Sequence, residues 1–141
     1  MSLQISNTLT RTKEPFIPIE AGKVRMYICG PTVYADAHIG HAMFAIVFDV
    51  VRRYLEYSGY QVQHAQNFTD VDDKIISRAA DLGIAPEDLA NQMIEDWLIQ
   101  ARALNILPPT LAPRATQEID TIIEMIEHLI ASGFAYPVES G

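Results

Sequence analysis

The sequence is poor in the residues that define several protein classes. One cysteine, Cys29, excludes an intramolecular disulfide and suits a reducing compartment. Eight prolines and seven glycines in 141 residues, with abundant Ile and Leu, exclude collagen-like and disordered chains. No apolar run approaches the roughly 20 residues of a membrane span, and the N-terminus lacks the basic and apolar segments of a secretory signal. We therefore expect one soluble, cytoplasmic domain that contacts no membrane.

Positive charge is also scarce, and the net charge of −8 is unevenly distributed. Residues 1–64 carry six Lys/Arg against five Asp/Glu, whereas residues 65–141 carry four against thirteen. An acidic second half is a poor surface for a phosphate backbone. Any contact with nucleic acid is therefore expected in the first half or outside this chain.

Periodicity predicts a strand, a helix and a second strand in the first half. After an extended lead-in over residues 5–22, a strand is expected over residues 24–29 and another over residues 61–68. Between them, a helix is expected from Ile39 to Tyr57. This helix is apolar almost all round, and we expect it to be buried.

The second half reads mainly as helices. They are expected from Thr69-Asp70 to Gly83, from Pro86 to about Leu104 with Pro108-Pro109 as a break, and from Ile119 to Ile130, closed by Gly133. Their Ile and Leu stripes, together with Trp97, are expected to form core. A strand over residues 134–138 and a turn at residues 139–141 complete the expected elements.

Strand, long helix and strand form the βαβ pattern of a parallel sheet. In such sheets ligands bind beyond the carboxyl ends of the strands. The two ends are residues 29–32 (Cys-Gly-Pro-Thr) and residues 67–70 (Asn-Phe-Thr-Asp), and both are rich in reactive groups. The sequence therefore predicts an α/β fold with its site at these ends.

Two histidines stand at the start of the first helix. His38 and His41 are three residues apart, so they share one helical face. A helix N-terminus suits a phosphate, and two imidazole donors there can stabilise charge that develops on it. Gly40 leaves room for a flat ring to approach the backbone. The alternative is a pair of capping or surface histidines.

Other groups leave alternatives open. Cys29 is either a small packing residue or a ligand, and a zinc site needs three or four ligands. Asp70, Asp72 and Asp73 are either favourable charges in a first helical turn or contacts for a ligand ammonium or magnesium. Thr69 is either a cap or a hydroxyl that contacts substrate.

Together these residues resemble the cysteinyl-tRNA synthetase family, over residues 5–141. The matching segments are residues 26–34 (MYICGPTVY), 38–41 (HIGH), 48–49 (FD), 53–55 (RYL), 67–76 (NFTDVDDKII) and 113–116 (PRAT). HIGH alone marks any class I aminoacyl-tRNA synthetase, whereas its combination with the other segments is more specific. The resemblance implies a Rossmann-like nucleotide-binding fold of the HUP type, of which residues 1–141 are the incomplete N-terminal half.

The resemblance also implies a reaction and its residues. The reaction is activation of cysteine with ATP and Mg²⁺ to cysteinyl-adenylate, followed by transfer to tRNA(Cys). His38 and His41 match the catalytic pair that stabilises the phosphates, and they bind ATP together with Thr32 and Gly40. Gly30 and Thr69 match cysteine-binding positions. Cys29 matches one ligand of a zinc ion that binds the substrate thiolate, and zinc selects cysteine over serine because a hydroxyl binds it poorly.

Several features of the family pattern are missing from this sequence, and their absence predicts how the chain behaves. The other zinc ligands, the KMSKS loop, the rest of the catalytic domain and the anticodon-binding domain are absent, so we expect the chain alone to be inactive and to self-associate. Met43 stands where the family has an arginine. Two alternatives remain: a related ligase that joins cysteine to an amino sugar, and a non-catalytic nucleotide-binding or interaction module.

Overall fold

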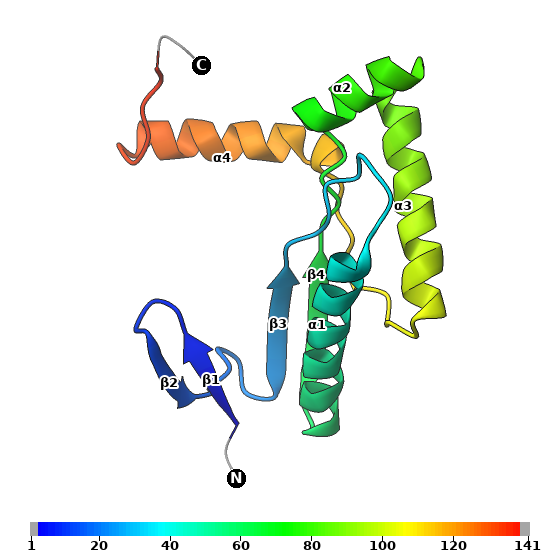
Figure 1. The fold of residues 1–141 in the computed structure, drawn as a ribbon. Coiled ribbons are helices and arrows are strands. Elements are labelled where there is room, and N and C mark those ends of the chain that lie inside the picture. The colour runs from blue at the N-terminus through cyan, green and yellow to red at the C-terminus, as the bar shows by residue number, and fades with distance from the viewer. Residues whose placement is uncertain (1–2, 139–141) are drawn as a thin grey trace.

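The computed structural model describes residues 3–138 (Figure 1). Its elements are β1 (Gln4–Asn7), β2 (Thr12–Pro15), β3 (Lys23–Ile28), α1 (Ile39–Tyr57), β4 (Gln61–Gln66), α2 (Asp73–Leu82), α3 (Pro86–Ala103), a 3₁₀ turn (Ala115–Gln117) and α4 (Ile119–Ala131). No helix among the described residues is both long and apolar enough to cross a membrane.

The parallel βαβ unit is confirmed. β3 pairs with β4 in parallel, with Lys23 opposite Gln61 and Ile28 opposite Gln66, and α1 makes the crossover along one face of this sheet (Figure 1). The predicted bounds of α1 are also confirmed, with Ser58 as C-cap and Gly59 at φ 91°. This fold brings the two strand ends side by side.

The sheet continues beyond its two regular strands. Thr32 forms a parallel bridge with Thr69, so the pairing of β3 and β4 resumes after a break. On the other side of β4, residues 110–114 run parallel to it, through bridges from Ala65 to Leu111 and from Phe68 to Arg114. Short segments of irregular backbone thus extend the sheet at the carboxyl ends of β3 and β4.

The core lies where α2 and α3 pack against the end of the sheet. Its buried members are Val33, Ala45, Phe68, Ile75, Ala79, Leu89, Ala90, Ile94 and Trp97. The expectation of core is confirmed for Trp97 and for Leu89, Ala90 and Ile94 of the α3 stripe, whereas Leu98 and Leu104 of the same stripe are exposed. α2 begins three residues later than expected, because Asp70 is held elsewhere and Asp72 caps the helix by accepting from the Lys74 N–H at 2.8 Å.

The expected burial of α1 is wrong for the described residues. Only Ala45 and Leu55 are buried, whereas Met43, Val47, Val50 and Tyr54 are half or more exposed. The sheet covers one face of the helix, and no described element covers the face that carries these four residues. The apolar stripe of α4 is likewise unburied, because α4 projects away from the core (Figure 1).

Two smaller expectations also need correction. The extended lead-in forms an antiparallel hairpin, in which Gln4 pairs with Pro15 and Asn7 with Thr12. The strand expected over residues 134–138 is absent, because no described strand lies where it could pair with them. The turn expected at residues 139–141 lies outside the described residues.

Candidate functional site

Helix α1 begins with a reciprocal cap made by its two histidines. The Nδ1 atom of His38 accepts from the Gly40 N–H at 3.1 Å, and the Nδ1 atom of His41 accepts from the His38 N–H at 3.2 Å. The two rings lie 4.0 Å apart, centroid to centroid. The two histidines therefore do cap the helix, as the alternative interpretation expected. Their Nδ1 atoms are occupied by this cap, which determines where the Nε2 protons lie.

An Nδ1 atom that accepts a hydrogen bond carries no proton, so the proton of each neutral ring resides on Nε2. Burial, and then the neighbouring His38, lower the pKa of His41. Both causes favour the neutral form of His41. The cap thus turns two imidazoles into Nε2–H donors that remain unused by protein groups in residues 3–138.

A pocket of about 330 Å³ lies beside this cap. It is lined by Cys29, Gly30, Pro31, Thr32, Gly40, His41, Phe44, Ala45, Gln66 and Trp97. Trp97 is both core and pocket wall, and its ring meets that of His41 edge-on at 6.5 Å. Of the seven residues that the family resemblance assigns to the site, five therefore meet here, and only His38 and Thr69 are outside the lining.

The glycines of this site are held by close contacts. A Cβ on Gly30 would lie 1.4 Å from the carbonyl oxygen of Asn67. Only glycine therefore fits at this point, where the two neighbouring strand ends approach each other closely. A Cβ on Gly40 would lie 2.9 Å from the His38 ring. The capping histidine thus takes the place that a side chain on residue 40 would occupy, while Gly40 itself still lines the pocket.

Thr69 lies near the pocket without lining it. It is not a helix cap, because its backbone pairs with Pro31 and Val33 and its hydroxyl accepts from Asn67 at 3.3 Å. Asn67 was missed as a site residue, although it stands at the strand end that the sequence identified. Its contacts reach residues up to 40 positions away, which no local pattern reveals.

The acidic cluster has structural roles. The Asp70 carboxylate is buried and accepts from both the N–H and the hydroxyl of Thr116, at 2.9 and 2.7 Å. Asp72 caps α2, and Asp73 lies in its first turn. Asp72 and Asp73 therefore fit the helix-turn interpretation, whereas Asp70 lies outside the helix and is held by Thr116.

The thiol of Cys29 is exposed at the end of β3. No three His, Cys, Asp or Glu side chains within residues 3–138 come close enough together to hold a metal ion. The described residues therefore offer a zinc ion one thiol ligand and do not fit it by themselves.

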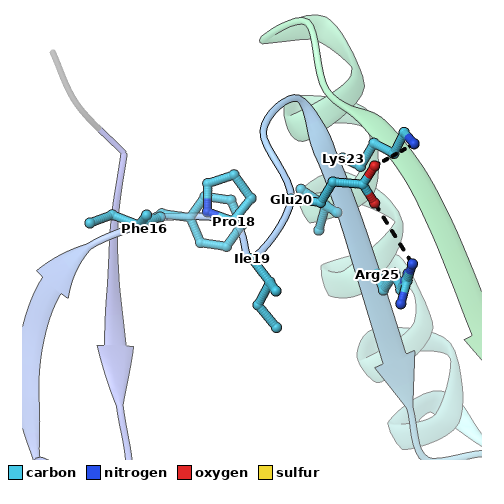
Figure 2. A pocket seen from close by; sticks show the side chains of 8 residues that line it. Phe16, Pro18, Ile19, Glu20, Lys23 and Arg25 are labelled. Atoms are coloured by element: carbon cyan, nitrogen blue, oxygen red, sulfur yellow. Dashed lines mark hydrogen bonds and ion pairs between the residues drawn. The ribbon is translucent and has the colours of Figure 1, made fainter.

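A second pocket, of about 270 Å³, lies between the hairpin and β3 (Figure 2). Phe16, Pro18 and Ile19 form its apolar part, and Glu20 joins Lys23 and Arg25 in an ion-paired rim. It contains none of the residues that the sequence singled out. The candidate site is therefore the pocket at the strand ends.

Solved structures share this fold. The chain resembles the Mycobacterium tuberculosis methionyl-tRNA synthetase in complex with methionyl-adenylate, over 60% of this chain and 16% of that one, with TM-score 0.58 and 24% identity. It resembles the agnB2 LeuRS–tRNA–LeuAMS ternary complex of Agrobacterium radiobacter K84 over 85% of this chain and 16% of that one, with TM-score 0.67 and 17% identity. The fold is that of the Rossmann-like catalytic domains of class I tRNA synthetases.

Comparison with sequence relatives identifies the family within the class I tRNA synthetases. Residues 15–141 match the family described as tRNA synthetases class I (C) catalytic domain, and the chain belongs to this family. Relatives from Lachnoclostridium phytofermentans and Symbiobacterium thermophilum, both named Cysteine–tRNA ligase, are 54% and 55% identical over 95% and 100% of the chain. The chain spans 28% and 30% of their lengths. The resemblance stated from the sequence is thereby confirmed.

Proposed function

We propose that the protein containing this chain is a cysteine–tRNA ligase that acts in the cytoplasm. It joins cysteine to the AMP part of ATP as cysteinyl-adenylate, with release of pyrophosphate, and then transfers the cysteinyl group to tRNA(Cys). The names of the relatives support the tRNA acceptor over an amino sugar. We further propose that residues 1–141 are the N-terminal half of its catalytic domain.

The observation that carries the proposal is the histidine cap. In adenylate formation the carboxylate of cysteine attacks the α-phosphorus of ATP, a new C–O–P bond forms, and the bond to pyrophosphate breaks. Negative charge shifts onto the phosphate oxygens during this step. Two Nε2–H donors fixed at a helix N-terminus can stabilise that charge without reorganising.

The other site residues have binding roles in this proposal. Thr32 and Gly40 bind ATP, which enters with Mg²⁺, and Gly30 and Thr69 bind cysteine. Cys29 supplies one ligand of a zinc ion whose remaining ligands come from outside the described residues. When bound, zinc favours a thiolate over a hydroxyl. Residues 65–138 are too acidic to be the main tRNA surface.

The test is His41→Asn in the intact gene product. Removal of one preorganised donor costs about 10²–10³ in rate, so cysteine-dependent ATP–pyrophosphate exchange is expected to slow by that factor while the Kd for ATP changes little. The exposed His128 provides a matched control, since His128→Asn on α4 is expected to leave exchange unchanged. Equal losses in exchange and in ATP binding would contradict a role in the transition state.

A further inference from the structure

One asparagine joins the two strand ends through its side chain. The Oδ1 atom of Asn67 accepts from the Gly30 N–H at 2.8 Å and from the Tyr27 hydroxyl at 2.9 Å. Its Nδ2 atom donates to the Thr69 hydroxyl oxygen at 3.3 Å. The first two contacts connect the segment that carries Cys29 to Asn67, and the third holds the Thr69 hydroxyl within the strand end that carries Asn67.

The orientation of this amide follows from its partners. A backbone N–H can only donate, so the atom that faces Gly30 must be Oδ1, and Nδ2 must face Thr69. The Thr69 oxygen therefore accepts from Asn67, and the proton of that hydroxyl remains for another acceptor. In residues 3–138 no protein group takes it.

The geometry leaves Asn67 little freedom. Its carbonyl oxygen lies against Gly30 so closely that a Cβ there would overlap it. The backbone of Thr69 is fixed as well, since its N–H donates to the Pro31 carbonyl at 3.2 Å and its carbonyl accepts from the Val33 N–H at 3.3 Å. The amide and the hydroxyl therefore face one another within one strand end, which is held in place by contacts with Gly30, Pro31 and Val33 of the neighbouring strand end.

We infer that Asn67 is a positioning residue for cysteine recognition, an inference that rests on the proposed function. Its amide holds the Thr69 hydroxyl so that the proton of this hydroxyl points to the substrate. A donor at this place suits the carboxylate or the thiolate of the amino acid. Tyr27 supports Asn67 by donating to the same oxygen as Gly30.

The experiment is a double-mutant cycle in the intact gene product, read by cysteine-dependent ATP–pyrophosphate exchange. Asn67→Asp keeps the shape and the oxygen that faces Gly30, but places an acceptor opposite Thr69, whose hydroxyl then donates to the new carboxylate. A lost hydrogen bond to a charged group raises the KM for cysteine about tenfold or more. The KM for ATP is expected to stay unchanged.

The second arm is Thr69→Val, which is expected to raise the KM for cysteine by a similar factor. In that background Asn67→Asp is expected to add less than about twofold, because its effect acts through the missing hydroxyl. Asn91→Asp on α3 makes the same charge change away from the site and is expected to leave the KM for cysteine unchanged.

Each result decides one claim. Normal exchange by the wild type, with an unchanged KM in Asn67→Asp or fully additive effects with Thr69→Val, would overturn the inference alone. Wild-type protein that shows no cysteine-dependent exchange would overturn the proposed function. If Asn67→Asp does not fold, Asn67→Ala takes its place in the cycle, and a failure of both to fold would assign Asn67 to the fold and overturn the inference.

Discussion

The two nitrogens of an imidazole allow one side chain to serve the helix and the ligand together. In His38 and His41 the Nδ1 atoms complete the start of α1, and the Nε2 atoms remain as donors. The shared face of these histidines was predictable from their spacing. The hydrogen bonds of Asn67 were not, since they depend on how two distant strand ends meet.

Cys29→Ser in the intact gene product tests the proposed zinc ligand. A serine hydroxyl is a poor zinc ligand, so zinc content measured by atomic spectroscopy is expected to fall. Discrimination between cysteine and serine in pyrophosphate exchange is expected to weaken with it. Unchanged zinc together with unchanged discrimination would show that the exposed Cys29 thiol is not a zinc ligand.

The buried His64 on β4 is expected to make the free energy of unfolding depend on pH. It is buried, and neither ring nitrogen has a hydrogen-bond partner among residues 3–138. Burial and then Arg52 lower its pKa, and Asp49 opposes this shift. Below pH 6.5 the imidazole of His64 therefore binds a proton more readily in the unfolded chain than in the folded chain. The free energy of unfolding is accordingly expected to fall as the pH drops below that value.

Urea unfolding of wild type and His64→Phe at a series of pH values measures this effect. The variant removes the buried imidazole, so its stability is expected to fall less between pH 7.5 and 5.5. His128→Phe, on the exposed helix α4, controls for the loss of a histidine. An identical decline in wild type and His64→Phe would show that His64 does not contribute.

Among the elements, α1 was the most predictable. Its bounds follow from one long apolar segment between His38 and Ser58-Gly59, all readable locally. The hairpin β1–β2 was not predicted, because its short polar strands carry no alternating pattern. The start of α2 was placed too early, because the contact between Asp70 and Thr116 spans 46 residues.

The close approach of the strand ends after β3 and β4 requires glycine at position 30, because there is no room for a Cβ atom. Gly30→Ala would drive Cβ into the Asn67 carbonyl, so it is expected to cost about 3 kcal/mol or more in urea unfolding. Gly133→Ala meets no atom within 4 Å and carries only the strain of φ 77°, a cost of about 1–2 kcal/mol. Equal losses in the two variants would contradict the close approach at Gly30.

At the scale of the whole molecule, apolar surface remains uncovered. The faces of α1 and α4 and the free edge of β3 are open within residues 3–138. The sequence predicted these apolar stripes but not their exposure, because a stripe shows that a face prefers burial without showing what covers it. The same holds for residues 134–138, which have strand-like composition but pair with no strand of the described part of the chain.

This surface predicts the behaviour of the 141-residue chain by itself. It is expected to fold but to associate, because open edges and apolar patches attract one another. It is also expected to lack pyrophosphate exchange and stoichiometric zinc, since one thiol does not close a tetrahedral site. Light scattering over a concentration series, exchange assays and metal analysis measure these properties, and zinc-dependent exchange by a strict monomer would contradict the prediction.

Residues 110–114 pair with β4 but are synthesised long after it. The far edge of β4 pairs with Leu111, which leaves the ribosome 45 residues after Gln66. At ordinary elongation rates this edge stays open for about 2–9 s. Helices α2 and α3 are made during that interval. The nascent βαβ unit is thus open to wrong strand pairing along this edge until residues 110–114 have been made.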